Sequence, residues 1–209
     1  MSEFVKRTDV KNTNLYHGAR FYEIPALFPK AGFIQIHQSD PNGSETVQKS
    51  DLTQTTYFSD LQQIAKAYPM YERRSTSSDL MLPLGIILST DTNIVAVRRI
   101  AKEETKLILS PDERSTQHVR ICEHPVQVKD IKSLLVLIYP KVINEMKKMS
   151  LNCPSIVTGD AISPFDLKRF HREGLIITQR IKKHYPNIKV ALEFVDMDPQ
   201  NAKKIIYST

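Results

Sequence analysis

Short apolar stretches separated by turn-forming residues dominate the chain between residues 82 and 139. They read LPLGIILST, NIVAVRRI, KLIL, QHVRIC and SLLVLIY, and their β-branched residues predict a block of short strands. An earlier short strand is predicted at residues 15–18, LYHG. The stretch FYEIPALFPKAGF at 21–33 then predicts a short helix, which its prolines limit and Gly32 ends.

Helical patterns flank the strand block on both sides. In YFSDLQQIAKAY, Ser59 or Asp60 can cap a helix that runs through Tyr68, where Pro69 stops it. The later part of the chain predicts helices at 141–149, 163–184 and 198–206 and a strand at 188–195. The helix at 163–184 is expected to start at Ser163, a cap followed by proline.

The order of these elements indicates an α+β chain rather than a regular βαβ alternation. We expect a polar arm at 1–13, a core at 14–140 and a helical extension at 141–209 that ends in a strand and a helix and packs on the core. Neither GxGxxG nor a Walker motif is present, so the two standard nucleotide-binding loops are not predicted.

Composition narrows the possible surroundings of the chain only slightly. The chain has 209 residues, of which 41% are hydrophobic, and no apolar run approaches the roughly 18 residues of a membrane span. The N-terminus has no apolar leader, and Cys122 and Cys153 lie far apart in sequence. We therefore expect no membrane partner and a reducing, cytoplasmic setting, although a secreted effector would have the same features.

Positive charge is concentrated late in the chain. The net charge of the chain is +6. The stretch 163–185 has only two acidic residues, Asp166 and Glu173, against six basic ones: Lys168, Arg169, Arg172, Arg180, Lys182 and Lys183. An amphipathic, solvated helix is the ordinary explanation. One alternative is a nucleic-acid contact, because clustered Lys and Arg attract phosphate groups, and the other is a protein target.

The dipeptide His17-Gly18 stands at the end of the first predicted strand. A lone histidine is usually only a polar residue at a strand end. Gly18, however, has no side chain, so a planar ligand can lie against its backbone and bond to its N–H and C=O groups. A carboxamide suits that donor–acceptor pair.

Tyr57 and Tyr68 lie eleven residues apart, close to three helical turns. The first leaves a predicted strand and the second lies on the helix that follows, so both can face one pocket. Two core tyrosines would be the ordinary explanation. Two aromatic faces can also hold a flat heteroaromatic ring between them, and they hold a cationic ring more strongly.

These residues carry a resemblance to a known family. LYHGARFYEIPALFPKAGFI and YFSDLQQIAKAY resemble the first two motifs of the poly(ADP-ribose) polymerase and diphtheria toxin class of ADP-ribosyltransferases. The third motif, a strand carrying a glutamate and a later apolar strand, is similar to QHVRICEHPVQVKDIKSLLVLIY, with Gln117 in place of the glutamate. The resemblance covers roughly residues 14–139. It implies a split antiparallel β-sheet with flanking helices.

The resemblance also implies roles for individual residues. His17 would bond the adenosine ribose of NAD, and Gly18 the nicotinamide carboxamide. Tyr57 and Tyr68 would flank the nicotinamide ring. Two further residues would line the site, Ser59 and Arg20, the latter toward the adenosine or pyrophosphate. NAD would be a co-substrate, and no metal is implied.

The missing glutamate leaves the chemistry open. His17, Tyr57 and Gln117 would be the catalytic residues, with Glu193 as a second candidate for the carboxylate position. The expected activity is mono-ADP-ribosyl transfer from NAD to a protein or nucleic acid. The alternatives are a catalytically silenced NAD- or ADP-ribose-binding module and an enzyme similar to RNA 2′-phosphotransferases. The sequence does not distinguish a toxin or effector from a housekeeping enzyme.

Overall fold

A seven-stranded sheet forms the centre of the computed structural model, which describes residues 13–34, 56–72, 80–99, 117–149, 155–159 and 166–206. Its strand order is β6-β7-β2-β1-β5-β8-β9. The strands are β1 (Asn14–Arg20), β2 (Thr56–Ser59), β5 (Leu84–Asp91), β6 (Arg98–Arg99), β7 (Val119–Cys122), β8 (Ser133–Ile138) and β9 (Lys189–Phe194). Two short strands, β3 (Tyr71–Glu72) and β4 (Leu80–Met81), form a separate pair. The chain is therefore α+β, as predicted.

The strands of the main sheet run antiparallel to their neighbours except β8 and β9, which are parallel. Strand β1 pairs with β5 at seven positions, from Asn14–Asp91 to Arg20–Gly85. With β2, by contrast, it pairs at Tyr16–Ser59 alone among the described residues. The sheet is therefore firmly joined on one side of β1 and opens on the other.

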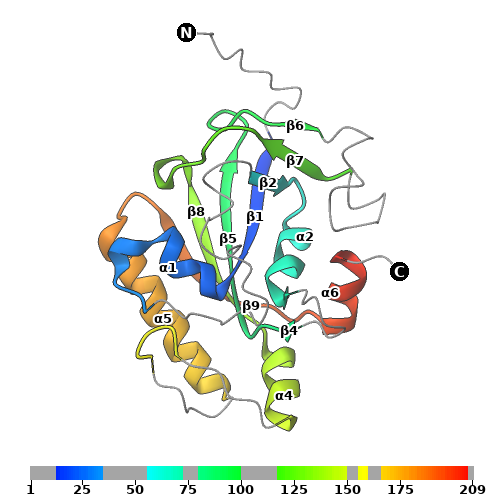
Figure 1. Cartoon of the computed structure of the whole chain (residues 1–209), viewed down its shortest axis with the longest axis vertical. Helices are drawn as coiled ribbons and strands as arrows, with labels where there is room; N and C mark the ends of the chain where they lie inside the picture. Colours follow the sequence, from blue (N-terminus) through cyan, green and yellow to red (C-terminus); the bar gives the residue numbers. More distant parts are fainter. Residues whose placement is uncertain are drawn as a thin grey trace, which may run out of the picture.

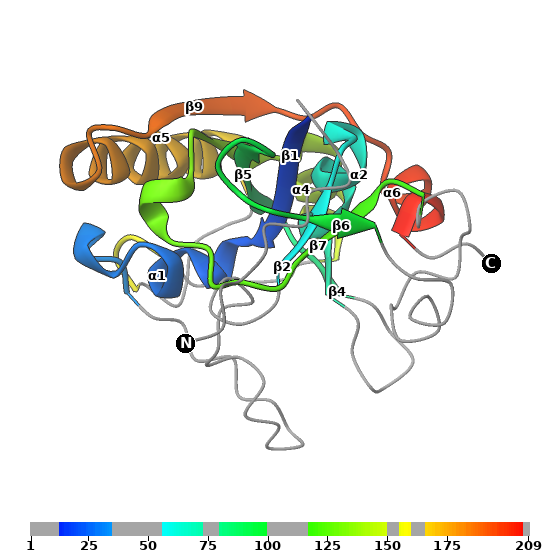
Figure 2. The same cartoon turned by 90° about the horizontal axis from the view of Figure 1, so that it is seen from above.

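Helices cover both faces of this sheet (Figure 1). They are α1 (Ile24–Leu27), α2 (Gln62–Ala67), α4 (Pro140–Lys148), α5 (Leu167–His184) and α6 (Pro199–Ile206). Figures 1 and 2 show α1 and α5 on one side of the sheet and α2 and α6 on the other. Short 3-10 turns extend two of them: η1 (Phe21–Glu23) and η2 (Pro29–Ala31) beside α1, and η5 (Tyr68–Met70) after α2.

Helix α5 buries an apolar stripe against the sheet. The sequence predicts a buried side made of Phe165, Leu167, Phe170, Ile177 and Ile181. Phe170, Ile177 and Ile181 are fully buried, whereas Leu167, the first residue of the helix, is 39% exposed and Phe165 lies outside the described residues. Gly174 lets the helix lie close to the side chains of Leu192 on β9 and Ile138 on β8. Because side chains alternate along strands, this is the face toward which Ala19 and His17 of β1 also point.

Helix α2 lies on the opposite face, unusually close to β1. A Cβ atom on Gly18 would lie 2.3 Å from the carbonyl oxygen of Ala65, and one on Gly85 would lie 2.5 Å from Cβ of Pro69. Both glycines point toward this face, since Gly85 pairs with Arg20, two residues beyond Gly18. The absence of two side chains is what lets α2 and η5 settle on the sheet.

Several predicted elements are confirmed. The early strand and the short helix form, and Gly32 ends η2 in the left-handed conformation with φ of 67°. The helices at 141–149 and 198–206 and the last strand also form within a residue or two of their predicted bounds.

Three predicted boundaries are wrong. The helix expected to be capped by Ser59 or Asp60 begins at Gln62, after Leu61, and no side chain caps it. Of the strand predicted at 93–100, the described residues 93–99 form a strand only at Arg98–Arg99, because the residues before it turn around Asp91, whose backbone and side-chain oxygens accept from Asn93, Ile94 and Val95. Helix α5 begins at Leu167, not Ser163, because Asp166 is extended and its carboxylate accepts a hydrogen bond from the Lys168 amide. The strand KLIL, the arm 1–12 and Cys153 lie outside the described residues.

The C-terminal part of the chain completes the main sheet. Strand β9 pairs with β8 from Ser133–Lys189 to Ile138–Phe194 and forms one edge. Tyr71, which follows η5, donates a hydrogen bond of 2.5 Å to the Pro199 carbonyl at the start of α6.

None of the helices that the structure describes combines the length and the apolar composition that a membrane span requires.

Candidate functional site

His17 is fixed at the point where β1 and β2 part. Its side chain is buried, and its ring meets Phe58 edge to face with centroids 5.9 Å apart. Its Nδ1 donates a hydrogen bond of 2.8 Å to the Tyr57 carbonyl. A carbonyl oxygen only accepts, so the neutral imidazole carries its proton on Nδ1 and has an acceptor at Nε2. This hydrogen bond links β1 to β2 through a side chain, at a position where neighbouring strands are usually linked by backbone hydrogen bonds. The same bond fixes the tautomer of the imidazole.

Gly18 is covered on one face but lies at the opening of the sheet. The Ala65 carbonyl and Pro69 block the space above its Cα atom. If the register of Tyr16–Ser59 is continued, Tyr57 stands opposite Gly18 across the opening. A planar ligand that bonds to the Gly18 backbone therefore has to enter edge-on between β1 and β2, rather than lie flat on the glycine.

Tyr57 and Tyr68 are both exposed beside this opening. Their relative exposures are 45% and 37%, whereas Phe58, which follows Tyr57 on β2, is buried. Tyr68 directly precedes Pro69, which contacts the position above Gly18. The structure therefore brings the two tyrosines to the surroundings of His17 and Gly18, and neither ring is part of the core.

Arg20 acts on Tyr68 in a way that the sequence did not indicate. Its guanidinium carbon lies 5.0 Å from the centroid of the Tyr68 ring, and its Nε donates a hydrogen bond of 3.0 Å to the Tyr71 carbonyl. Glu23 closes the group, with an Nη1–Oε1 distance of 3.7 Å. Arg20 thus covers one face of Tyr68, so a ligand ring would stack on the other face. The i,i+3 spacing of Arg20 and Glu23 was the sequence signal from which their ion pair could have been predicted.

Ser59 and Asp60 hold the corner between β2 and α2. The Ser59 hydroxyl accepts a hydrogen bond of 3.0 Å from the Leu61 amide, so its oxygen is used locally. Asp60 forms an ion pair with Arg120 of β7 and accepts from His118 Nδ1 at 2.7 Å. Arg120 is only 5% exposed, and this buried pair fixes the start of α2. Sequence analysis did not identify Arg120 or His118.

Gln117 lies just before β7, away from His17. Its side chain is exposed, and its carbonyl accepts a hydrogen bond of 2.7 Å from Arg120. The register Ser59–Val119 places it opposite the start of α2, beyond the end of β2. It lies three residues before Arg120, the partner of Phe58, so it is about 10 Å along the strand from the level of His17. The structure does not bring its amide to the opening.

Glu193, the second candidate for the carboxylate, is paired elsewhere. It lies on β9 in one row with Leu137, Gly85 and Arg20, so three strand spacings, about 14 Å, separate it from β1. Its carboxylate accepts from Lys66 Nζ of α2 at 2.5 Å. Helix α2 therefore stands between Glu193 and the opening.

Tyr139 holds the C-terminal end of α2, where Lys66 lies. It is fully buried and donates a hydrogen bond of 2.6 Å to the Lys66 carbonyl. Burial, and secondarily the negative charge of Glu193, raises the pKa of Tyr139 well above its ordinary value, so the phenol stays a donor. Burial is also the main reason that the pKa of the Cys122 thiol is raised, which makes this cysteine a poor nucleophile.

The assembled site is an opening in a sheet with aromatic rings at its mouth, an imidazole at its end and a backbone amide in its wall. This arrangement can bind a flat ring with a hydrogen-bonding edge. The described residues hold no group of three or more His, Cys, Asp or Glu side chains that could bind a metal ion. Comparison of the chain with protein-family models, curated proteins and solved structures finds no match.

Proposed function

We propose that this chain is an NAD-dependent mono-ADP-ribosyltransferase with the split-sheet fold of that class. The observation that carries the proposal is the pair of exposed tyrosines, Tyr57 and Tyr68, beside Gly18 where β1 and β2 part. Buried core tyrosines were the ordinary alternative, and exposures of 45% and 37% speak against it.

The nicotinamide ring of NAD fits this opening chemically. Its carboxamide would enter edge-on and bond to the Gly18 backbone, while its cationic ring stacks on the face of Tyr68 that Arg20 leaves uncovered. A cation over an aromatic ring contributes about 0.5–2 kcal/mol, depending on how far the pair is desolvated. Tyr57 would close the other side of the ring.

The fixed tautomer of His17 suits a ribose. Its Nδ1 proton is held by the Tyr57 carbonyl, so Nε2 is the atom that can accept a hydrogen bond from a ribose hydroxyl. The same bond ties the imidazole to the backbone of Tyr57. The hydrogen bond between His17 and the Tyr57 carbonyl would therefore position both the ribose contact, at His17, and the nicotinamide contact, at Tyr57.

Transfer would break the bond between the nicotinamide nitrogen and ribose C1′. The bonding pair leaves with nicotinamide, which becomes neutral, and the acceptor's nucleophile bonds to C1′ and loses its proton. Positive charge develops on the ribose, as in glycoside hydrolysis. Gln117 carries no charge and lies away from the opening, so an acidic acceptor would have to supply the negative charge.

One observation favours a silenced NAD-binding module as the second candidate. Three carboxylates on the elements around β1 and α2 are already in ion pairs: Glu23 with Arg20, Asp60 with Arg120 and Glu193 with Lys66. A paired carboxylate stabilises a developing cation less, because its charge is already compensated. Under this alternative the site binds NAD but does not release nicotinamide.

Nicotinamide release from NAD by the purified chain tests the proposal. We expect slow release by the native chain. Because Gln117 lies away from the opening, Gln117→Glu should leave the rate of release unchanged, and faster release by this variant would show that Gln117 does reach the site. A native chain that binds NAD without releasing nicotinamide would contradict the enzyme and support the silenced module.

NAD binding by calorimetry tests the aromatic pair directly. Tyr57→Ala and Tyr68→Ala should each weaken binding about tenfold or more, because each removes one stacking face. Phe194→Ala is the matched control, since Phe194 is equally exposed, at 48%, but lies on edge strand β9. Equal binding by the control and the tyrosine variants would remove the basis of the proposed site.

A further inference from the structure

The exposed face of α5 carries a line of positive charge. Lys168, Arg172, Lys182 and Lys183, here called the basic stripe, are all exposed. They recur with exposed Leu175 and Gln179 at intervals of three or four residues, which places them along one side of the helix. From Lys168 to Lys183 the stripe is about 22 Å long.

The charge of this stripe is not compensated within the described residues. No ion pair involves any of its four side chains there. Glu173, the one acidic residue inside α5, is buried and bound to Arg169 at 2.9 Å. Asp166 lies before the first turn, where its carboxylate caps the Lys168 amide.

Helix stability explains only half of the stripe. Lys182 and Lys183 lie in the last turn, where the helix dipole favours cations. Lys168 lies in the first turn, where the same dipole disfavours a cation, and Arg172 lies in the second turn, beyond the reach of the dipole. Helix stability therefore explains neither residue, and an external partner would explain both.

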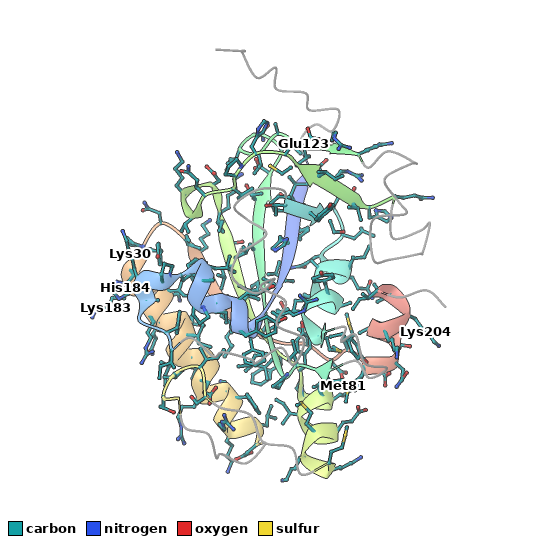
Figure 3. The ribbon with its side chains drawn as sticks, viewed as in Figure 1. Lys30, Met81, Glu123, Lys183, His184 and Lys204 are labelled. Carbon is teal, nitrogen blue, oxygen red and sulfur yellow. The ribbon has the colours of Figure 1, made fainter. Side chains whose placement is uncertain are left out.

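A second element adds charge at the C-terminal end of the stripe. Figure 3 shows Lys30 of η2 beside Lys183 and His184 at the end of α5. Arg180 ties the two elements together by donating a hydrogen bond of 3.2 Å to the Gly32 carbonyl. The positive surface thus extends from α5 onto a neighbouring, fixed segment.

We propose that the basic stripe binds the phosphate backbone of nucleic acid. An extended line of unpaired Lys and Arg matches a regular row of phosphates, with about one charge per 3.4 Å along each strand. Membrane binding would also need an exposed apolar helix face, and the apolar face of α5 is buried against the sheet. The proposal is independent of NAD, because the stripe lies on the helix face turned away from the sheet.

Fluorescence anisotropy with a labelled 20-base-pair DNA duplex tests this proposal without NAD. Each phosphate neutralised by the stripe contributes about 0.9 to the slope of log affinity against log salt. We therefore expect a slope near −4, and affinity on the order of 100-fold lower at 200 mM than at 50 mM KCl. A labelled single strand of 20 uridines shows in parallel which form of nucleic acid binds better.

A charge-matched pair of variants assigns the binding to α5. The stripe variant carries Lys168→Gln, Arg172→Gln, Lys182→Gln and Lys183→Gln. The control variant has the same net charge, with the exposed residues Lys129, Lys147, Lys148 and Lys204 changed to Gln. We expect at least a tenfold loss of affinity and a much flatter salt dependence for the stripe variant, and less than a threefold loss for the control.

Three results would overturn the proposal: no binding by the native chain at 50 mM KCl, equal losses in the two variants, or binding to phosphatidylserine vesicles without binding to either nucleic acid. Thermal unfolding of both variants verifies that they are folded. Arg172→Gln alone is the milder test, and it should reduce the salt slope by about 1.

Discussion

Helices α2 and α5 cover opposite faces of one sheet, but they are held in different ways. Helix α2 has only six residues, and backbone atoms of the sheet and helix meet at Gly18. Its ends are fixed by polar contacts, through Asp60 at the start and the Lys66 carbonyl at the end. Helix α5 has eighteen residues and is held by buried apolar side chains.

The charged side chains of the two regions also differ in whether they are paired within the fold. Around α2, Asp60 and Lys66 are each bound to an opposite charge from another strand. On α5, the basic stripe has no such partners among the described residues. The difference teaches that polar groups near α2 position the proposed site, whereas those on α5 remain available for a partner. Each prediction below changes one side of this comparison.

The largest expected effect comes from the aspartates that precede the two helices. Asp60→Ala leaves the Arg120 guanidinium buried without its counter-charge, which should lower the free energy of unfolding by about 3–5 kcal/mol. Asp166→Ala removes only a cap from α5 and should cost about 1 kcal/mol. Urea unfolding of both variants measures the contrast, and equal losses would show that the Asp60–Arg120 pair does not anchor α2.

The second largest effect is expected at the glycines where each helix meets the sheet, which should differ in how well they tolerate alanine. Gly18→Ala forces a Cβ atom against the Ala65 carbonyl at 2.3 Å, so α2 must move, and we expect a loss of about 1–3 kcal/mol or more. Gly174→Ala meets only the end of the Leu192 side chain at 2.7 Å, which can rotate. The better helix propensity of alanine offsets that contact by about 1 kcal/mol. A Gly174→Ala variant as destabilised as Gly18→Ala would contradict this difference.

Tyr139 should make the α2 region sensitive to alkaline pH. In the unfolded chain its phenol loses a proton near pH 10, whereas in the fold it keeps the proton because its pKa is raised. Below pH 10 both states are protonated and nothing changes. Above pH 10 the unfolded state releases a proton, so stability falls by about 1.4 kcal/mol per pH unit up to the pKa of the folded state.

Tyr139→Phe should remove this alkaline loss. At neutral pH the variant should be less stable by about 1–3 kcal/mol, because the Lys66 carbonyl loses its donor. Urea unfolding at pH 7, 10 and 11 separates the two effects. The native chain and the variant should converge as the pH rises, and parallel curves would show that Tyr139 does not titrate as argued.

The smallest effect on stability is expected on α5. Lys182→Gln should change the free energy of unfolding by less than about 0.5 kcal/mol, because its side chain is exposed and unpaired. The same variant should still lower nucleic-acid affinity. A stabilising role for Lys182 would appear as a clear loss of stability and would make the two helices more alike than we propose.

Local patterns were sufficient to predict much of the chain. The strand around His17, the end of the early helix at Gly32 and the buried stripe of α5 follow from residue type and spacing, which act over a few residues. The proximity of His17, Gly18 and the two tyrosines was also predicted, since a strand, a turn and one helix connect Tyr57 to Tyr68.

Contacts between distant segments were decided by the tertiary structure alone. The ion-pair partners of Asp60 and Glu193, and the contacts of Arg20 with Tyr68 and Tyr71, depend on which elements lie side by side, and no local spacing encodes that. For the same reason, the sequence order suggested Gln117 or Glu193 at the site, while the register places one beyond β2 and the other on β9. Residue type determines what each segment can form, and packing determines which side chains meet.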